Sequence, residues 1–218
     1  MQAQHAPADL PAVAASRSPE PDRSRQLIDA ANQLLEEGGL EGLTIRAVLK
    51  RTGLARRAFY ERFVGKDDLV LAVFEETLRE AAQFYREEAE QFPAPIDKIK
   101  VVVVGLVTGA LGNEGGFGEQ RVAAMVREHL RLAQTRPGEL QAALRPLLDF
   151  IAEQVTEGIR IGQLRDGDPV LQATLIYNLV ATTLHTELMT KEAMGPATER
   201  EDQLSDGIWE FCRRAITA

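Results

Sequence analysis

Residues 44–63 have the sequence TIRAVLKRTGLARRAFYERF, two short amphipathic segments joined by a glycine turn. Thr44 has the side chain of a helix N-cap, and the apolar residues after it recur on one helical face. Gly53 is expected to end this helix, and a second short helix follows over about 55–62. Two short helices at this spacing are typical of a helix-turn-helix, whose second helix enters the major groove of DNA.

Basic residues are concentrated around this segment. The whole chain of 218 residues has 25 Lys and Arg against 33 Asp and Glu, a net charge of −8, whereas residues 44–66 hold seven basic side chains against Glu61 alone, a local charge of +6. Because a polyanion is bound by a basic surface, this distribution predicts that one small region meets an anion. A solvated basic face on an ordinary helical bundle is the alternative explanation.

Apolar residues keep a 3.6-residue period along most of the chain, so the sequence predicts an all-α fold of about nine helices. Residues 1–21 hold four of the ten prolines and lack this period, so we expect a disordered tail. The sixth helix is expected over about 118–135, and Pro146 is expected in the first turn of the seventh. The expected helices run over about 22–37, 44–51, 55–62, 67–92, 95–111, 118–135, 146–161, 169–194 and 198–216.

The stretch Arg25–Leu69 resembles the DNA-binding domain of the tetracycline-repressor (TetR) family of bacterial transcription regulators. The matching positions are Ala30-Ala31, Glu37-Gly38, Leu43-Thr44-Ile45, Thr52-Gly53-Leu54, Phe59-Tyr60-Glu61-Arg62-Phe63, Lys66 and Leu69. Later in the chain, Gly162-Gln163-Leu164-Arg165 with Asp168-Pro169 resembles the turn between the seventh and eighth helices of that family. The resemblance implies a helix-turn-helix domain over 22–68 and an effector-binding, dimerising domain over 69–218.

The resemblance also implies roles for individual residues. Thr44, Tyr60 and Lys66 would hold DNA phosphates, and the third helix would contact bases. With the arginines of the two short helices, the predicted DNA-binding residues are Thr44, Arg46, Arg56, Arg57, Tyr60 and Lys66.

Three positions depart from the family pattern: Ala55 replaces a frequent serine cap, Arg57 a glycine and Ala58 a hydroxyl residue. Arg57 is expected to add a contact of its own, to a guanine edge or to a phosphate. The two alanines keep open an alternative function, an all-α ligand-binding or scaffolding protein that has lost DNA binding.

The remaining helices predict a dimer and a small-molecule site. The partners that the resemblance implies are a palindromic double-stranded DNA operator, a second copy of the chain joined through the eighth and ninth helices, and a small, mostly apolar effector that releases a repressor from DNA. Gly105 and Gly109 either make room for this molecule or permit close helix packing. The predicted dimer residues are Leu175, Leu179, Leu204, Ile208 and Phe211, and the predicted effector residues are Phe84, Leu106, Met125, His129 and Tyr177.

The sequence does not support an enzyme, a metal-binding protein or a membrane protein. There is no nucleophile beside a base, no phosphate-binding glycine loop and no paired-carboxylate pattern, so we expect neither an enzyme nor a cofactor. Three separated histidines and the single Cys212 give no metal site. The longest nearly apolar stretch, 101–111, has 11 residues, whereas a bilayer span takes about 20. We therefore expect a cytoplasmic protein without a membrane segment.

Overall fold

Nine α-helices make up the part of the chain that the computed structural model describes, residues 22–111, 119–194 and 198–218. No β-strand occurs in these ranges, so the all-α prediction is confirmed. The predicted tail, 1–21, lies outside the described residues. The helices are α1 (Arg23–Gly42), α2 (Ile45–Thr52), α3 (Arg56–Tyr60), α4 (Lys66–Ala89), α5 (Pro95–Leu111), α6 (Glu119–Thr135), α7 (Pro137–Arg160), α8 (Pro169–Met194) and α9 (Thr198–Ile216).

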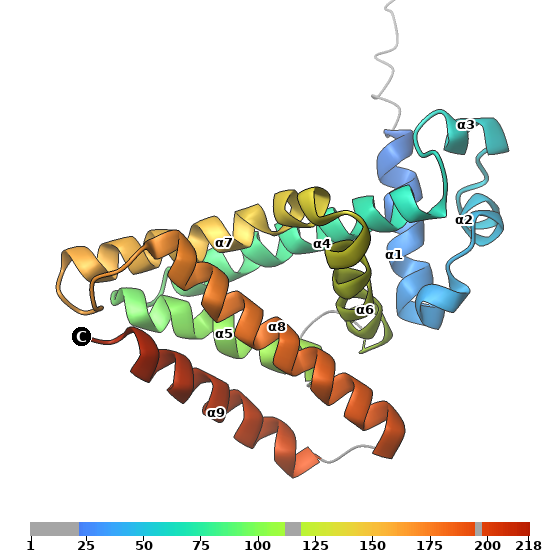
Figure 1. Cartoon of the computed structure of the whole chain (residues 1–218). Helices are drawn as coiled ribbons and strands as arrows, with labels where there is room; N and C mark the ends of the chain where they lie inside the picture. Colours follow the sequence, from blue (N-terminus) through green and yellow to red (C-terminus); the bar gives the residue numbers. More distant parts are fainter. Residues whose placement is uncertain (1–21, 112–118, 195–197) are drawn as a thin grey trace, which may run out of the picture.

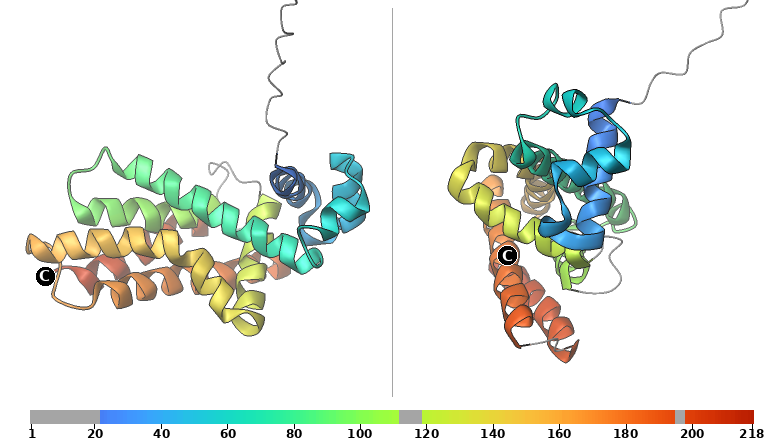
Figure 2. Two further views of the ribbon diagram at one scale, coloured as in Figure 1. Left: turned by 90° about the horizontal axis from the view of Figure 1, so that it is seen from above. Right: turned by 90° about the vertical axis from the view of Figure 1, so that its right-hand side faces the viewer.

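The helices form a small lobe and a larger bundle (Figure 1). Helices α1, α2 and α3 gather at one end of the molecule, and α4 runs from this lobe into the bundle, where it packs along α7. Seen from above, the small lobe extends beyond the bundle at the start of α4 (Figure 2). Helix α6 packs against α1 as well as α7, so the lobe contacts the bundle through both α4 and α6.

Glycines end the first two helices, as the sequence predicts. In α1 the helical path is broken at Gly38 and at Gly39, which has a φ of 57°. Helix α2 ends at Gly53, whose φ of 69° is in the left-handed region that glycine adopts without steric cost. Helix α3 is shorter than expected, because it spans only Arg56–Tyr60.

The predicted start of the seventh helix is wrong. Helix α7 begins at Pro137 and continues through Pro146, which lies inside it. The apolar stripe explains the difference, because Leu140, Ala143 and Leu144 are already buried before the second proline. Pro146 is exposed, so water can hydrate the carbonyl group that loses its helical hydrogen bond.

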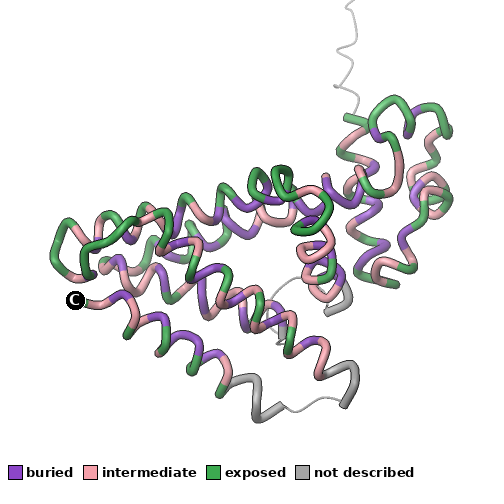
Figure 3. Tube along the Cα trace, viewed as in Figure 1, coloured by how far each residue is buried: buried purple, intermediate pink, exposed green. Residues whose placement is uncertain are grey.

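Burial follows the faces of the helices that point inward (Figure 3). In the small lobe, Leu27, Leu35, Val48 and Phe59 are fully buried. In the bundle, α5 is apolar on most sides, and its Ile99, Val102 and Val103 are buried. The apolar cluster is continuous along α4, since buried residues run from Leu69 in the lobe to Ala89 in the bundle.

Gly105 permits close packing of α5 on α4. A methyl group at this position would overlap the ring of Tyr85, a buried residue of α4. Gly109, one turn later, has room and lines a cavity. Gly105 therefore permits close helix packing, whereas Gly109 makes room at the cavity.

We predict that Gly105→Ala lowers the free energy of unfolding by about 1–3 kcal/mol, because the added methyl group forces the buried Tyr85 ring to move. Urea denaturation followed by circular dichroism measures this. The matched control is Gly138→Ala, because a methyl group on Gly138 of α7 meets no atom within 4 Å. A loss of stability in the control as large as in Gly105→Ala would contradict the prediction.

Candidate nucleic-acid interface and ligand cavity

The turn of the helix-turn-helix is fixed by local hydrogen bonds. The Thr44 hydroxyl accepts a hydrogen bond of 3.1 Å from the backbone N–H of Ala47, so the predicted N-cap of α2 is confirmed. At the other end of α2, the N–H of Gly53 donates to the Leu49 carbonyl at 3.0 Å. These two caps fix both ends of α2 and hence the direction in which the chain enters α3.

The inner face of α3 is anchored in the lobe. Phe59 is fully buried and Phe63 is 9% exposed, so both belong to the core. Tyr60 packs edge-on against Phe59 but is 46% exposed, and its hydroxyl accepts a hydrogen bond of 3.3 Å from Arg56. Core packing of the two phenylalanines therefore presents Tyr60 and Arg56 together on the outside.

The two departures to alanine have distinct structural outcomes. Ala55 is the N-cap residue of α3 and gives this helix no side-chain cap. Ala58 is buried at 8% exposure and packs inward. Neither residue presents a polar side chain on the outer face of α3.

Most of the basic residues of α2 and α3 are exposed. Within the described ranges, Arg46, Lys50 and Arg62 form no ion pair, so their charge faces solvent. Arg57, with a side chain 89% exposed, pairs with Glu61 of the same turn at 2.8 Å. Arg51 is different, because its guanidinium makes two hydrogen bonds of 2.7 Å to Glu37 of α1 and so joins α2 to α1.

Lys66 lies at the junction between the lobe and α4. Its ammonium donates a hydrogen bond of 2.8 Å to the backbone carbonyl of Leu40 in α1, and its side chain is half-buried. An ammonium has three N–H donors, so two remain for an anion. Lys66 therefore ties the start of α4 to the end of α1.

The start of α4 is also tied to α6. Arg131 of α6 lies 3.4 Å from Asp67, and Arg136, the N-cap residue of α7 directly after α6, donates to Asp68 at 2.8 Å. Asp68 in turn accepts a hydrogen bond of 3.0 Å from the Val64 backbone N–H, in the segment that follows α3. A chain of polar contacts thus runs from Arg136, at the junction of α6 and α7, through Asp68 to the segment that follows α3.

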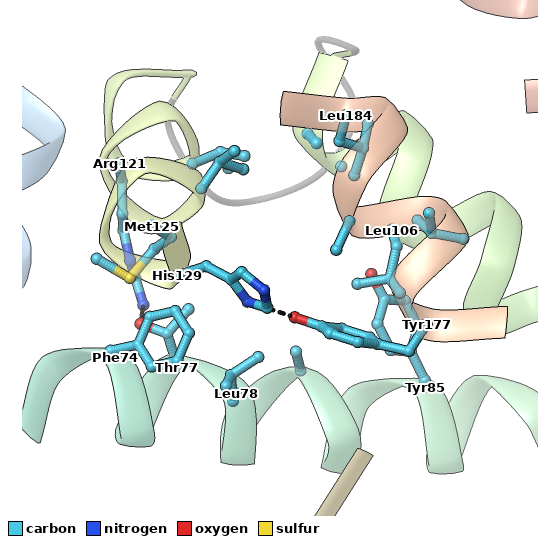
Figure 4. Close-up of a pocket in the computed structure, with 17 residues that line it drawn as sticks. Phe74, Thr77, Leu78, Tyr85, Leu106, Arg121, Met125, His129, Tyr177 and Leu184 are labelled. Carbon is cyan, nitrogen blue, oxygen red and sulfur yellow. Dashed lines mark hydrogen bonds between the residues drawn. The ribbon is translucent and has the colours of Figure 1, made fainter. Parts of the chain in front are cut away.

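A cavity of about 130 Å³ lies inside the bundle (Figure 4). It is lined by residues of α4, α5, α6 and α8, and its lining is mostly apolar. The lining residues are Phe74, Thr77, Leu78, Ala81, Tyr85, Leu106, Gly109, Ala110, Arg121, Val122, Met125, Val126, His129, Tyr177, Val180, Ala181 and Leu184.

Four of the five residues predicted from the sequence for the effector site line this cavity: Leu106, Met125, His129 and Tyr177. Phe84 does not. It lies on the outer side of α4, 52% exposed, and lines a separate groove with Val101 and Val104 of α5. The helical period explains the difference, because Tyr85, the next residue, takes the inward position.

His129 and Tyr177 form a polar pair within the apolar lining. The Tyr177 hydroxyl lies 3.1 Å from His129 Nδ1, and the two side chains point toward each other in Figure 4. Burial, together with the nearby His185, lowers the pKa of His129, and burial raises the pKa of Tyr177. At neutral pH both groups are therefore uncharged and can exchange hydrogen bonds with a ligand.

Arg121 is a cavity residue that the sequence prediction missed. It is 6% exposed, and its guanidinium donates to Thr77 Oγ1 of α4 at 2.9 Å and to Glu36 Oε1 of α1 at 3.2 Å. Figure 4 shows it reaching from α6 toward Thr77. Its spacing of four from Met125 and eight from His129 places the three residues on one face of a helix, and this periodicity could have identified it.

The exposed apolar side chains of α8 and α9 are the candidates for a dimer surface. Leu175 is 59% and Phe211 is 66% exposed, and Leu179 and Leu204 are half-buried. Ile208 is buried at 6% within this chain, because the inward side of α9 packs on α5. The prediction that Ile208 belongs to the dimer surface is therefore wrong, and Ile208 is a core residue. Val170 and Leu171, exposed at the start of α8, were not among the predicted residues.

Within the described residues, no group of three or more His, Cys, Asp or Glu side chains is placed to hold a metal ion. Among the described helices, none is both long and apolar enough to cross a bilayer.

Comparison with known proteins finds a family match in the N-terminal part of the chain and related regulators over most of its length. Residues 27–73 match the family described as "Bacterial regulatory proteins, tetR family". The fatty acid metabolism regulator protein of Bacillus subtilis (strain 168) is 22% identical over 168 residues, 77% of this chain and 84% of that protein. The HTH-type transcriptional regulator BetI of Brucella suis biovar 1 is 26% identical over 155 residues, 68% of this chain and 75% of BetI.

Solved structures have the same fold. FadR from Bacillus subtilis, in complex with stearoyl-CoA, superposes with a TM-score of 0.65 at 21% identity and covers 86% of this chain and 96% of FadR. The SmeT–triclosan complex gives a TM-score of 0.62 at 23% identity, with coverage of 90% and 92%. Together, the helix-turn-helix, the matched N-terminal stretch and the related regulators support a transcriptional regulator of the TetR family.

Proposed function

We propose that this regulator is a repressor that binds a palindromic DNA operator as a homodimer and leaves it when a small, mostly apolar effector occupies the cavity of the bundle. The observation that carries the proposal is the combination of an exposed basic helix pair and a lined cavity joined by one helix, α4. We assign DNA binding to residues 22–68 and effector binding and dimerisation to 69–218. A protein that acts on bacterial chromosomal DNA works in the cytoplasm.

Exposure and charge support a DNA contact at α2 and α3. Arg46, Arg56 and Tyr60 are exposed on these helices, and Thr44 lies at the exposed start of α2. An arginine beside a helix N-terminus is well placed for a phosphate, because the backbone N–H groups there also attract anions. In our proposal, Thr44, Arg46, Tyr60 and Lys66 contact phosphates, and Arg56 and Arg57 reach the base edges. Arg57 must first exchange its ion pair with Glu61.

The α8 and α9 faces support a homodimer. Phe211, Leu171 and Leu175 are large apolar side chains that are more than half exposed. They belong to the same end of the molecule, because Thr217, after α9, pairs with Leu164, just before α8. Such side chains are normally covered by a partner. A twofold dimer places two recognition helices in one arrangement and so requires a palindromic site.

The cavity supports a small effector. A cavity of about 150 Å³ lined by apolar side chains holds a benzene-sized molecule, and this one has about 130 Å³. In the related structures, FadR holds stearoyl-CoA and SmeT holds triclosan. A molecule as long as an acyl chain would need the helices of this bundle to move apart, whereas a single ring fits the space present.

Helix α4 and its contacts with α6 connect the effector cavity to the DNA-binding helices. An effector that displaces α6 acts on the start of α4 through the Arg131–Asp67 and Arg136–Asp68 pairs. The effector shifts the equilibrium only by its preference for the state that does not bind DNA. A preference of about 100-fold is worth roughly 2.7 kcal/mol per site. Two such sites in a dimer are enough to release a nanomolar operator complex.

We predict that affinity for an operator found by genomic footprinting falls with salt with a log–log slope of about −6. Arg46→Ala should reduce the magnitude of this slope by about 2 per dimer, because each protomer loses one phosphate contact. Fluorescence anisotropy at several salt concentrations measures the slope. The control is Arg165→Ala in the loop between α7 and α8, at the opposite end of the molecule from α3 (Figure 1).

Two results would reject this proposal. A slope near zero would mean that no phosphate is neutralised. A failure to shift any genomic fragment would favour the alternative, a helical ligand-binding protein that has lost DNA binding, for which the uncapped Ala55 and the buried Ala58 are the structural arguments.

We predict that Phe211→Glu dissociates the dimer and weakens operator binding with it, because a charged side chain cannot be buried between two apolar faces without a partner. Light scattering at micromolar concentration should report a dimer for the wild type and a monomer for the variant. Phe84→Glu is the control, since Phe84 is similarly exposed on α4, away from α8 and α9. A monomeric wild type, or dissociation by both substitutions, would contradict the assignment of this surface.

A further inference from the structure

A charged side chain, Arg121, lies in the mostly apolar wall of the cavity. The Arg121 side chain is 7% exposed and extends from α6 to α4 and α1. Its hydrogen bond to Thr77 runs along the cavity wall, because both residues line the cavity. The same guanidinium holds Glu36 of α1 at 3.2 Å, and Glu80 lies 3.6 Å away. A group in the cavity wall is thus bonded directly to the small lobe.

We propose that Arg121 binds the acidic end of the effector, and that the effector's carboxylate takes the place of Glu36 on the guanidinium. This inference rests on the proposed effector function and narrows it to a class of ligand. The effector is a small acid with one apolar ring or a short apolar chain. Its apolar part lies against Met125 and Leu106, and its acidic group lies at the Thr77 end.

The difference in burial decides which partner is replaced. The Glu36 side chain is 41% exposed, so water can solvate its carboxylate once it leaves Arg121. Arg121 is nearly fully buried, and a buried guanidinium must keep an anionic or hydrogen-bonding partner. Glu80 has a second cation, Arg25, at 3.6 Å, and is therefore held in place from both sides. A further carboxylate at this guanidinium is repelled by Glu36 and Glu80, so it binds by exchange with Glu36.

The exchange has a direct consequence for the DNA-binding lobe. Glu36 is on α1, whereas Arg121 and Thr77 are on helices of the bundle. The Arg121–Glu36 bond is therefore a contact between the lobe and the bundle that exists only while no acidic ligand is present. Occupation of the cavity breaks it and loosens α1 from α6. A neutral ligand of the same shape leaves the bond in place.

The test compares two probes of nearly the same shape that differ in charge, benzoate and nitrobenzene. Calorimetric titration of the full-length protein, without DNA, should show benzoate binding about tenfold more tightly, as expected for a charge-assisted hydrogen bond. Glu36→Gln should strengthen benzoate binding by about another tenfold, because the competing carboxylate is gone, and change nitrobenzene binding by less than twofold. The matched control is Glu41→Gln, which makes the same change of charge at an exposed position of α1.

Hydrogen–deuterium exchange supplies the second measurement. Benzoate should increase exchange of the backbone amides in residues 31–36, and nitrobenzene should not. Arg121→Gln should abolish the preference for benzoate. Because that variant removes a buried charge and can lose its fold, the Glu36→Gln result remains the primary criterion.

Equal affinities for the two probes, binding of neither probe, or equal effects of Glu36→Gln and Glu41→Gln would overturn the inference. These outcomes are separate from a failure of the proposed repressor function, because no titration contains DNA. A protein that does not bind DNA can still prefer benzoate, and an operator-binding protein can still fail to distinguish the two probes.

Discussion

The continuity of α4 is the constraint on which the rest of the structure depends. This helix of 24 residues places Leu69 and Val70 in the core of the lobe and Ala81 and Tyr85 in the core of the bundle. An uninterrupted helix is stiff, so its two ends cannot move independently. Any rearrangement of the bundle that tilts one end of α4 therefore changes the position of α3 at the other.

Ion pairs add to apolar packing in holding the lobe against the bundle. The lobe contacts the bundle through α1, α4 and α6, and charged groups cross each of these contacts. Arg25 of α1 pairs with the buried Glu76 of α4, and Arg131 of α6 pairs with Asp67 of α4. Ion pairs of this kind contribute less to stability than to geometry, because desolvation offsets much of their attraction. They hold one relative orientation of lobe and bundle and can exchange partners.

The sequence predicted the fold well because its signals are local. Thr44 and Gly53 specify the two ends of the eight-residue α2, and hydrophobic periodicity identifies the long helices. The start of α7 was wrong because the rule that proline begins a helix is only a preference, and the buried Leu140 outweighs it at Pro146. Four of the five predicted cavity residues do line the cavity, because their helical faces point inward.

The rest of the site depends on contacts between distant segments. Phe84 and Tyr85 are adjacent aromatic residues, and only the rotation of α4 against α5 decides which of them points inward. Arg121 resembles any surface arginine until α1 brings Glu36 to it across 85 positions of sequence. Ile208 and Phe211 both belong to an apolar stripe of α9, yet one is buried on α5 and the other is exposed. Periodicity identifies such a stripe but does not divide it between core and surface.

The uneven charge of the chain has a consequence for assembly. Residues 44–66 are positive by six, so the remainder of the chain is negative by fourteen. In the proposed dimer, two such bodies would repel each other where their α8 and α9 faces meet, whereas each basic lobe would attract DNA. Dissolved ions screen both interactions. Raising the ionic strength would therefore act with opposite sign on the two proposed equilibria: it would favour the pairing of subunits and disfavour their attachment to the double helix.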